Sequence, residues 1–313
     1  MTRPLKVGVQ LPEVERELRW PELLDMARAL EDLGYDSLWF GEHLLYRWRE
    51  RAPRGPWEAW AMLAGIAAAT RRIELGPLVA CTAFHNPAVL AKRADTIDEI
   101  SGGRLILGLG AGWNETEFRA FGIPFDHRID RFEEAFTIIR GLLRDGAIDF
   151  DGRYYQARDC ELLPRGPRAA SGGPPLMIGS NGERMLRITA AHVDAWNSWY
   201  ADTGNAPAGI APLRDKVDAA AREAGRDPAA IERTVAVQVR MPGGTGGRWA
   251  TATRSRTSRR SRVRPTPSPR NCGPTPARGS ATSSSSSTRS PANRSSDSHR
   301  SLCCSMAAEV GPA

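Results

Sequence analysis

Residues 73–109 read IELGPLVACTAFHNPAVLAKRADTIDEISGGRLILGL, a stretch with two strand patterns on either side of one helix pattern. Residues 73–80 and 105–109 are short apolar runs of the kind that form buried strands. Residues 87–100 carry apolar side chains at helical spacing, and a proline occupies the first position, where the helix does not need its missing N–H group. This order of strand, helix and strand predicts an α/β protein.

The same alternation continues before and after this stretch. Further strand patterns lie at residues 5–11, 37–40, 176–178, 195–198 and 234–239. Helix patterns separate them at residues 21–33, 57–70, 126–143, 183–191 and 212–223. The first strand centres, Val7, Leu38, Leu75 and Ile106, lie about thirty to forty residues apart, the spacing of units in a TIM (β/α)8 barrel. A doubly wound sheet is the alternative, because strand counts alone do not close a barrel.

Two regions do not fit this alternation. Residues 146–175 are too long for an ordinary loop and predict an insertion over one mouth of the barrel. Residues 251–300 contain 14 Ser, 11 Arg, 7 Thr and 6 Pro, and cannot bury enough apolar surface to offset the entropy of ordering them. The chain therefore divides into a barrel domain, residues 1–245, with its last βα unit lost or scrambled, and a disordered Arg/Ser-rich tail, residues 246–313.

The tail has two interpretations. One is an Arg-rich arm that binds nucleic acid. The other is a change of reading frame in the gene. A one-base shift lets the serine run 283–287 encode V-Q-L-V-L, and lets residues 264–302 encode a helix, a strand and a second helix. An unrelated tail would rarely contain this order, so the frame change is favoured. If the printed chain is what the cell makes, it is a truncated barrel with open edges and is expected to be inactive.

Charge and cysteine content give no sign of a nucleic-acid-binding or secreted protein once the tail is set apart. The formal net charge is +7, but residues 251–300 contribute +10 and the rest of the chain −3. Outside the tail only Cys81 and Cys160 remain, too few for a disulfide framework. The N-terminus has no signal-peptide pattern, and no apolar run is long enough to span a membrane. We therefore expect a cytoplasmic protein that binds neither nucleic acid nor membranes.

Side chains suited to proton transfer follow the second and third strands, at the mouth where a barrel carries its chemistry. Glu42 and His43 come directly after the second strand, in WFGEHLL. A histidine there can move a proton near neutral pH, although a structural Glu–His pair is the alternative. After the third strand, ACTAFHNP brings four more polar residues to the same mouth: Cys81, Thr82, His85 and Asn86. Asn86 also suits the N-cap of the following helix.

Glycine-rich turns follow the fourth and fifth strands. The fourth strand ends in LGLGAGWNETEF, whose Gly108, Gly110 and Gly112 allow close approach to the backbone but do not form a dinucleotide fingerprint. In MIGSNGERML, residues 179–182 precede a helix, so their N–H groups suit an anion such as a phosphate, or simply cap the helix. No Cys/His cluster has metal-ligand spacing, so we expect no metal site.

Five blocks of the sequence, taken in order, resemble the bacterial-luciferase-like family of flavin-dependent oxidoreductases. They are LGYDSLWFGEHL, RIELGPLVACTAFHNPAVLAK, SGGRLILGLGAGWNETEF, RFEEAFTIIRGLL and PLMIGSNGERMLRITAAHVDAWN. The resemblance implies a TIM barrel that binds FMN or the deazaflavin coenzyme F420 and acts on a small organic substrate. The reaction would be monooxygenation with reduced FMN or hydride transfer through F420, and the compact length favours the F420 branch. Relatives are commonly dimers, which implies a homodimer.

The resemblance also implies roles for individual residues. His43 and Glu42 lie beside the cofactor ring, with His43 as the proton donor or orienting group. The ring rests on the backbone of the bulged third strand, which often carries a non-prolyl cis peptide: Leu78, Val79, Ala80 and Cys81. The ribityl-phosphate end is held by the turn after the fifth strand: Gly179, Ser180, Asn181 and Gly182. Trp113 and Asn114 face the substrate.

Overall fold

The computed structural model describes residues 5–48, 51–239 and 305–310. Contacts divide the chain into two units, one formed by Met1–Gly247 with Ser301–Ala313 and the other by Arg248–Arg300. All of the second unit lies outside the described residues. The predictions of a disordered tail and of a changed reading frame fall largely on that unit, so they remain predictions.

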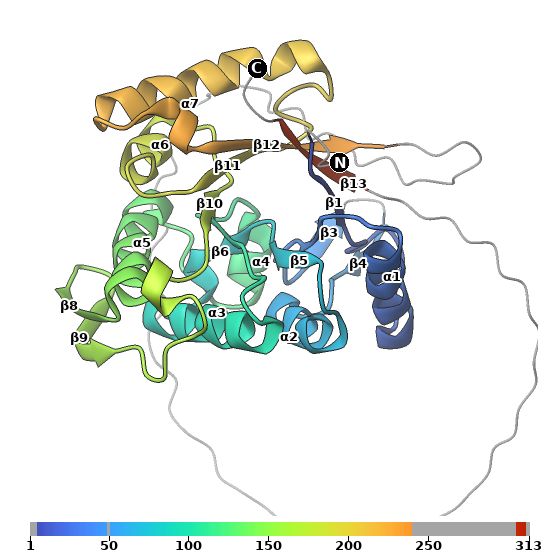
Figure 1. Ribbon diagram of the computed structural model, residues 1–313, viewed down its shortest axis with the longest axis horizontal. Helices are drawn as coiled ribbons and strands as arrows, with labels where there is room; N and C mark the ends of the chain where they lie inside the picture. Colours follow the sequence, from blue (N-terminus) through green and yellow to red (C-terminus); the bar gives the residue numbers. More distant parts are fainter. Residues whose placement is uncertain (1–4, 49–50, 240–304, 311–313) are drawn as a thin grey trace, which may run out of the picture. The chain divides into compact units, whose positions relative to one another are not determined.

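One sheet of nine strands forms the centre of the first unit (Figure 1). The strands are β1 (Val7–Gln10), β2 (Ser37–Phe40), β5 (Glu74–Pro77), β6 (Ala80–Cys81), β7 (Leu107–Gly110), β10 (Leu176–Ile178), β11 (Ala195–Ser198), β12 (Glu232–Gln238) and β13 (Ser305–Val310). Strands β5 and β6 are two parts of the third predicted strand, interrupted at Leu78 and Val79. Strand β5 stands at one end of the strand order and pairs with β2, whereas β6 stands at the other end and pairs with β7. The two ends of the sheet are therefore two parts of one strand. This closure confirms the TIM barrel and excludes the doubly wound sheet.

The eighth position of the barrel is occupied by β13, which runs antiparallel to both of its neighbours. Its residue Ala307 pairs with Gly8 of β1 and with Ala236 of β12. The other paired neighbours in this sheet are parallel. No strand is predicted here from the sequence, because SMAAEV follows a long polar segment and has no helix of a βα unit before it. Pairing with β13 satisfies two strand edges that would otherwise remain open.

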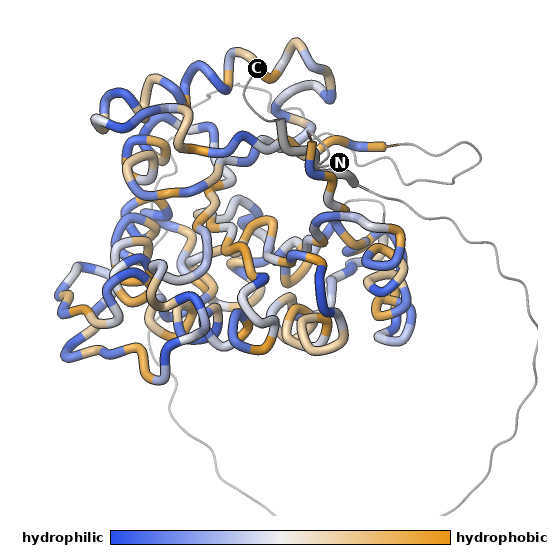
Figure 2. Tube along the Cα trace, in the orientation of Figure 1, coloured by the Kyte–Doolittle hydropathy of each residue, from blue (hydrophilic) through white to orange (hydrophobic). Residues whose placement is uncertain are grey.

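Helices follow the strands and lie outside them, as the alternating pattern predicts (Figure 1). They are α1 (Trp20–Asp32), α2 (Ala59–Ala69), α3 (Pro87–Ser101), α4 (Glu115–Ala120), α5 (Arg128–Asp145), α6 (Glu183–Thr189) and α7 (Ala211–Glu223). Asn86 caps α3 as predicted, since its side chain accepts hydrogen bonds from the N–H groups of Ala88 and Val89 at 3.0 and 3.2 Å. Hydrophilic and hydrophobic segments alternate along α7 in Figure 2. The buried residues of this helix are Val217 and Ala221, four positions apart, as on one face of an amphipathic helix.

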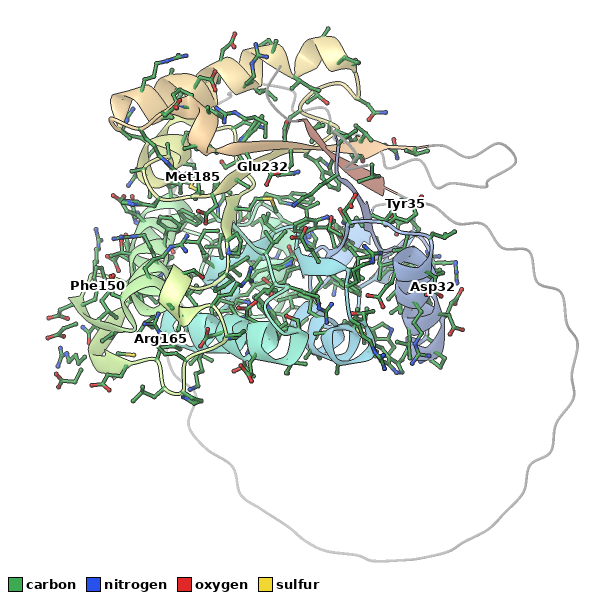
Figure 3. The ribbon with its side chains drawn as sticks, viewed as in Figure 1. Asp32, Tyr35, Phe150, Arg165, Met185 and Glu232 are labelled. Atoms are coloured by element: carbon green, nitrogen blue, oxygen red, sulfur yellow. The ribbon has the colours of Figure 1, made fainter. Side chains whose placement is uncertain are left out.

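The predicted insertion at residues 146–175 contains an antiparallel hairpin, in which Figure 3 labels Phe150 and, beyond it, Arg165. Its strands are β8 (Ala147–Asp151) and β9 (Gln156–Glu161). The carboxylate of Glu134 in α5 accepts hydrogen bonds from the N–H groups of turn residues 153–155 at 2.8–2.9 Å. The hairpin of the insertion therefore packs along α5, and its predicted place over one mouth of the barrel remains a prediction.

Two apolar layers hold the barrel together. The inner layer comes from the strands and from the interruption in the third strand: Trp39, Leu78, Met177, Ala195 and Ala236. The outer layer joins the alternate strand residues, such as Leu38 and Trp196, to buried helix residues such as Phe136. Side chains alternate along a strand, so Trp39 points into the barrel and Leu38 toward the helices. The same alternation tells which side chains at the strand ends point inward.

Candidate functional site

His43 lies directly beyond β2, at the carboxyl end of the barrel strands, where an acid of α4 anchors it. Its Nδ1 is 2.9 Å from Oε1 of Glu117, whose side chain is 1% exposed. The second oxygen, Oε2, accepts hydrogen bonds from the N–H groups of Leu44 and Leu45 at 2.8 and 3.3 Å. Glu117 thus fixes both the histidine ring and the loop that carries it. Because Nδ1 is engaged, Nε2 is the ring nitrogen left to face a ligand.

Neighbouring acids raise the pKa of His43 above its ordinary value. Burial alone would lower this pKa, because it disfavours the imidazolium ion. The hydrogen bond with Glu117 and the negative charges of Glu13, Glu117 and Glu42 outweigh burial. Conversely, burial raises the pKa of the Glu13 carboxyl group more than the nearby His43 lowers it. The site therefore favours a protonated histidine, as a proton donor requires.

Removing the charge of Glu117 is expected to lower the pKa of His43. In Glu117→Gln the amide keeps the size of the side chain but no longer favours the imidazolium ion. Because the folded-state pKa lies above the unfolded value of about 6.5, His43 stabilises the fold below that pH and loses this contribution as the pH rises through the folded-state pKa. The variant should lose this low-pH stabilisation.

An NMR titration of the His43 ring, with thermal unfolding followed from acidic to mildly basic pH, measures both effects. Glu115→Gln is the matched control, since Glu115 lies exposed on the same helix two residues earlier. A His43 pKa that is equal in Glu117→Gln and in wild type would contradict the assigned role of Glu117.

Two aromatic rings flank His43. Tyr46, in the hairpin of β3 (Tyr46–Trp48) and β4 (Arg51–Arg54), has its ring centroid 4.6 Å from that of His43. Trp113 makes an edge-on contact at 5.5 Å and is 60% exposed, so its indole offers apolar surface to a ligand. Asn114, the other residue predicted to face the substrate, donates to the carbonyl oxygen of Leu45 at 3.0 Å. Its amide therefore positions the loop after β2.

The side chain of Glu42 is buried and forms hydrogen bonds with three different parts of the fold. Its Oε1 accepts hydrogen bonds from the indole N–H of Trp60 in α2 at 2.6 Å and from Nε2 of His85 at 2.7 Å. Its Oε2 accepts one from the backbone N–H of Cys81 at 2.7 Å. These contacts engage both oxygens and leave only the charge of Glu42 acting on His43. The geometry therefore fits a positioning role toward the third strand better than a catalytic one.

His85 and Arg93 hold the carboxylate of Glu42 in place. Nδ1 of His85 accepts a hydrogen bond from Nη1 of Arg93 at 3.1 Å, so the ring proton is on Nε2 and points to Glu42. The guanidinium of Arg93 also lies 5.8 Å from the ring centroid of Trp60. Through His85, Arg93 compensates the buried negative charge. The structure thus brings Cys81 and His85 to one mouth, as the sequence predicts.

The interrupted third strand carries a cis peptide between Leu78 and Val79, at the place that the family resemblance implies. Val79 is partly exposed, and its side chain packs against three glycines: Gly108, Gly110 and Gly179. A Cβ atom on any of these glycines would lie only 2.8–2.9 Å from the side chain of Val79. Ala80 and Cys81 are buried and pair with β7. Burial and the charge of Glu42 raise the pKa of the Cys81 thiol, which argues against a nucleophilic role.

The turn between β10 and α6 comprises Gly179, Ser180, Asn181 and Gly182. The N–H group of Gly182 donates to Oγ of Ser180 at 3.4 Å, and the amide of Asn181 donates to Asp202 at 2.8 Å. The N-cap residue of α6 is Gly182, which has no side chain, so neither Ser180 nor Asn181 is the N-cap residue that the alternative interpretation expected. The predicted contact of this turn with a phosphate remains a prediction.

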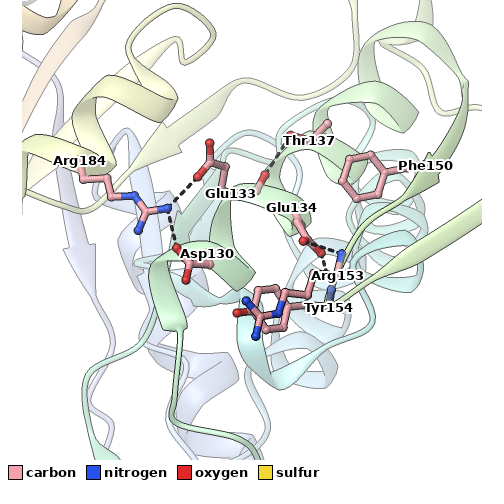
Figure 4. A pocket seen from close by; sticks show the side chains of 8 residues that line it. All are labelled: Asp130, Glu133, Glu134, Thr137, Phe150, Arg153, Tyr154 and Arg184. Carbon is pink, nitrogen blue, oxygen red and sulfur yellow. Dashed lines mark hydrogen bonds and ion pairs between the residues drawn. The ribbon is translucent and has the colours of Figure 1, made fainter.

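A hollow of ≈ 450 Å³ lies between α5, the β8–β9 hairpin and α6 (Figure 4). It is lined by Asp130, Glu133, Glu134, Thr137, Phe150, Arg153, Tyr154 and Arg184. Arg184 in this hollow already pairs with two acids, since it lies 2.5 Å from Asp130 and 3.0 Å from Glu133. The hollow does not include His43 or Trp113. We therefore place the chemistry at the strand ends, where the buried groups Glu13, His43 and Cys81 have shifted pKa values.

Several residues of this site are not singled out by the sequence: Glu13, Tyr46, Trp60, Arg93 and Glu117. A signal for Glu117 does exist, because GWNETEF places an acid just beyond the fourth strand, at the mouth of the barrel. Within residues 5–48, 51–239 and 305–310, no group of His, Cys, Asp and Glu has the arrangement of a metal site. The same part of the chain contains no helix that is long and apolar enough to cross a membrane.

Comparison with known proteins points to one family. Residues 6–242 match the family described as luciferase-like monooxygenase. A 5,10-methylenetetrahydromethanopterin reductase of Archaeoglobus fulgidus is 30% identical over 228 residues, which cover 73% of this chain and 62% of that protein. The chain spans about half the length of the other curated relatives that it matches first.

Two solved structures share the fold. An F420-dependent secondary alcohol dehydrogenase, in complex with an F420–acetone adduct, matches with a TM-score of 0.61 and 24% identity over 72% of this chain and 69% of that chain. The oxygenating constituent of 3,6-diketocamphane monooxygenase from Pseudomonas putida, in complex with FMN, matches with a TM-score of 0.59 and 20% identity over 73% and 66%.

Proposed function

Because the chain belongs to the luciferase-like monooxygenase family, we propose that it is an oxidoreductase that binds FMN or F420 at the carboxyl ends of its barrel strands. One arrangement carries this proposal: the His43–Glu117 pair lies next to the exposed indole of Trp113. A protonated imidazole beside an open aromatic surface suits a flat redox cofactor and a substrate that exchanges a proton.

The residues present fit such a cofactor. The partly exposed Val79 lies in the interruption between β5 and β6, next to the segment whose backbone Glu42 fixes through Cys81, and this provides a firm support for a ring. The N–H groups of the turn at residues 179–182 suit the phosphate end. Asp202, which binds the amide of Asn181, would repel a phosphate at that amide. We therefore assign the phosphate contact to Ser180 and to the backbone of the turn.

The protein's own residues supply position and a proton. Bound FMN or F420 would supply the redox chemistry itself. His43 holds a proton on Nε2, from which it can pass to the substrate, or can take one back. Glu117 orients the imidazole through Nδ1 and stabilises its charged form. Glu42 acts indirectly: it binds the backbone of Cys81 and so holds the third strand in register with β7.

The choice of cofactor and partners belongs to this proposal. Solved structures of the same fold carry F420 in one case and FMN in another, and the compact chain favours F420. We propose a small organic substrate, a homodimeric assembly and a cytoplasmic location. We propose no nucleic-acid partner, because the chain outside residues 251–300 has a net charge of −3.

A fluorescence titration tests the proposal. The purified protein is titrated with F420 and with FMN, and NADPH serves as a control ligand without a flavin ring. We expect saturable quenching of the fluorescence of F420 or FMN and no saturable response to NADPH. A folded protein that binds neither F420 nor FMN would contradict the proposed function.

A further inference from the structure

Gln10 ends β1 and points into the barrel at the rim that carries His43. A Cβ atom on Gly8, two residues earlier, would touch Nε1 of Trp39, a residue of the inner apolar layer. Val9, between them, belongs to the outer layer. Gln10 therefore shares the inward face with Gly8. Its side chain lies at the carboxyl end of the strand and is only 9% exposed.

The amide of Gln10 has one satisfied end and one unsatisfied end. Nε2 donates to Oε1 of Glu13, and the ionised form of Glu13 fixes this orientation of the amide, because a carboxylate accepts hydrogen bonds and cannot donate one. Oε1 of Gln10 is buried and has no hydrogen-bond partner in the part of the chain that the structure describes. Buried polar atoms are almost always paired, so among the described residues this inward-pointing acceptor stands out as one that a donor group of a bound ligand could satisfy.

The groups around Gln10 are those of the proposed reaction site. Glu13 also accepts a hydrogen bond from the hydroxyl of Tyr46 at 3.3 Å, and the ring of Tyr46 lies against His43. The carboxylate of Glu13 fills the space beside Gly41, where a Cβ atom would clash with it. Gln10, Glu13, Tyr46 and His43 therefore form one connected cluster at the mouth of the barrel.

We propose that Oε1 of Gln10 binds the ligand at the mouth of the barrel by accepting a hydrogen bond from an N–H or O–H group of that ligand. This inference rests on the proposed function. Two molecules expected there carry such a group: a flavin or deazaflavin through the imide N3–H of its ring, and an alcohol substrate through its hydroxyl. The nearby acids Glu13 and Glu117 disfavour an anion at the same position.

Paired ligands with and without the donor test this assignment. In the flavin arm, lumiflavin and 3-methyllumiflavin are titrated against wild type and Gln10→Met, and quenching of their fluorescence gives Kd. In the alcohol arm, 1-phenylethanol and its methyl ether are added to the cofactor-loaded protein, and the change in cofactor fluorescence gives Kd. Gln156→Met is the matched control, since Gln156 is an exposed glutamine of β9.

If Oε1 of Gln10 contacts the N–H or O–H group of the ligand, the effect of methylating that group should depend on whether Gln10 is present. Methylation should weaken binding to wild type about tenfold in one of the two arms and have little effect on Gln10→Met. A glutamine that only holds Glu13 would change the affinity for both members of a pair equally. Gln10→Asn, which withdraws the acceptor by one methylene, supports the same comparison if Gln10→Met does not fold. A wild type that binds lumiflavin but shows no coupling in either arm overturns the inference, whereas a wild type that binds no flavin contradicts the proposed function.

Discussion

Replacing His43 with alanine is expected to lower kcat by about 10²- to 10⁴-fold and to leave the Kd for the cofactor nearly unchanged. The pKa of His43 is raised by the acids around it, and Nε2 is turned away from Glu117. Loss of this proton donor removes an interaction made in the transition state, so kcat should fall while ground-state binding remains. Steady-state kinetics and a fluorescence titration measure the two quantities.

A histidine outside the site provides the control for this experiment. His192 packs beside Phe136, with ring centroids 6.2 Å apart, and belongs to the turn after α6. His192→Ala should keep both kcat and Kd. Unchanged turnover of His43→Ala on a verified substrate would remove His43 from the mechanism. Parallel loss of turnover and of cofactor binding would make it a binding residue instead.

Elements with strong local signals were predicted closely from the sequence. The predicted bounds of β2, β10 and β11 agree with the structure, because each is a short buried run of consecutive residues. Helix α3 begins at Pro87, where proline and the Asn86 cap both favour a helix start. Residues 73–80 were predicted as one strand, but the structure breaks it at Leu78 and Val79. Apolar character alone carries no sign of such an interruption.

The position of the site was predictable from the sequence, but the hydrogen bonds between its residues were not. Parallel strands bring their carboxyl ends to one rim, so Glu42, His43 and His85 could be placed together from strand order alone. Sequence spacing does not show which way a carboxylate turns. Glu42 binds Trp60 and His85 from distant elements, and the partner of His43 lies 74 residues along the chain. These contacts depend on how α2, α3 and α4 pack, which no local pattern specifies.

Ending the chain at Arg300 is expected to leave most of the protein in the insoluble fraction, because this truncation removes β13. Strands β1 and β12 would then present two open edges on a sheet that is otherwise closed. Unpaired edges of this kind promote aggregation between molecules. The soluble yield and the elution volume in size-exclusion chromatography measure the effect, with the full chain as reference.

Ala307→Pro tests the same closure with one residue and keeps the rest of the chain. Ala307 pairs on both sides, with Gly8 and Ala236, so a proline there removes a ladder hydrogen bond and should lower Tm by about 2–12 °C. Ala307→Ser retains the N–H group and should leave Tm nearly unchanged. If truncation and proline both leave Tm and cofactor binding intact, β13 does not close the barrel. The eighth strand would then have to come from elsewhere, which is what the shifted reading frame of residues 264–302 predicts, and sequencing the gene across the codons for residues 243–254 would decide between the two.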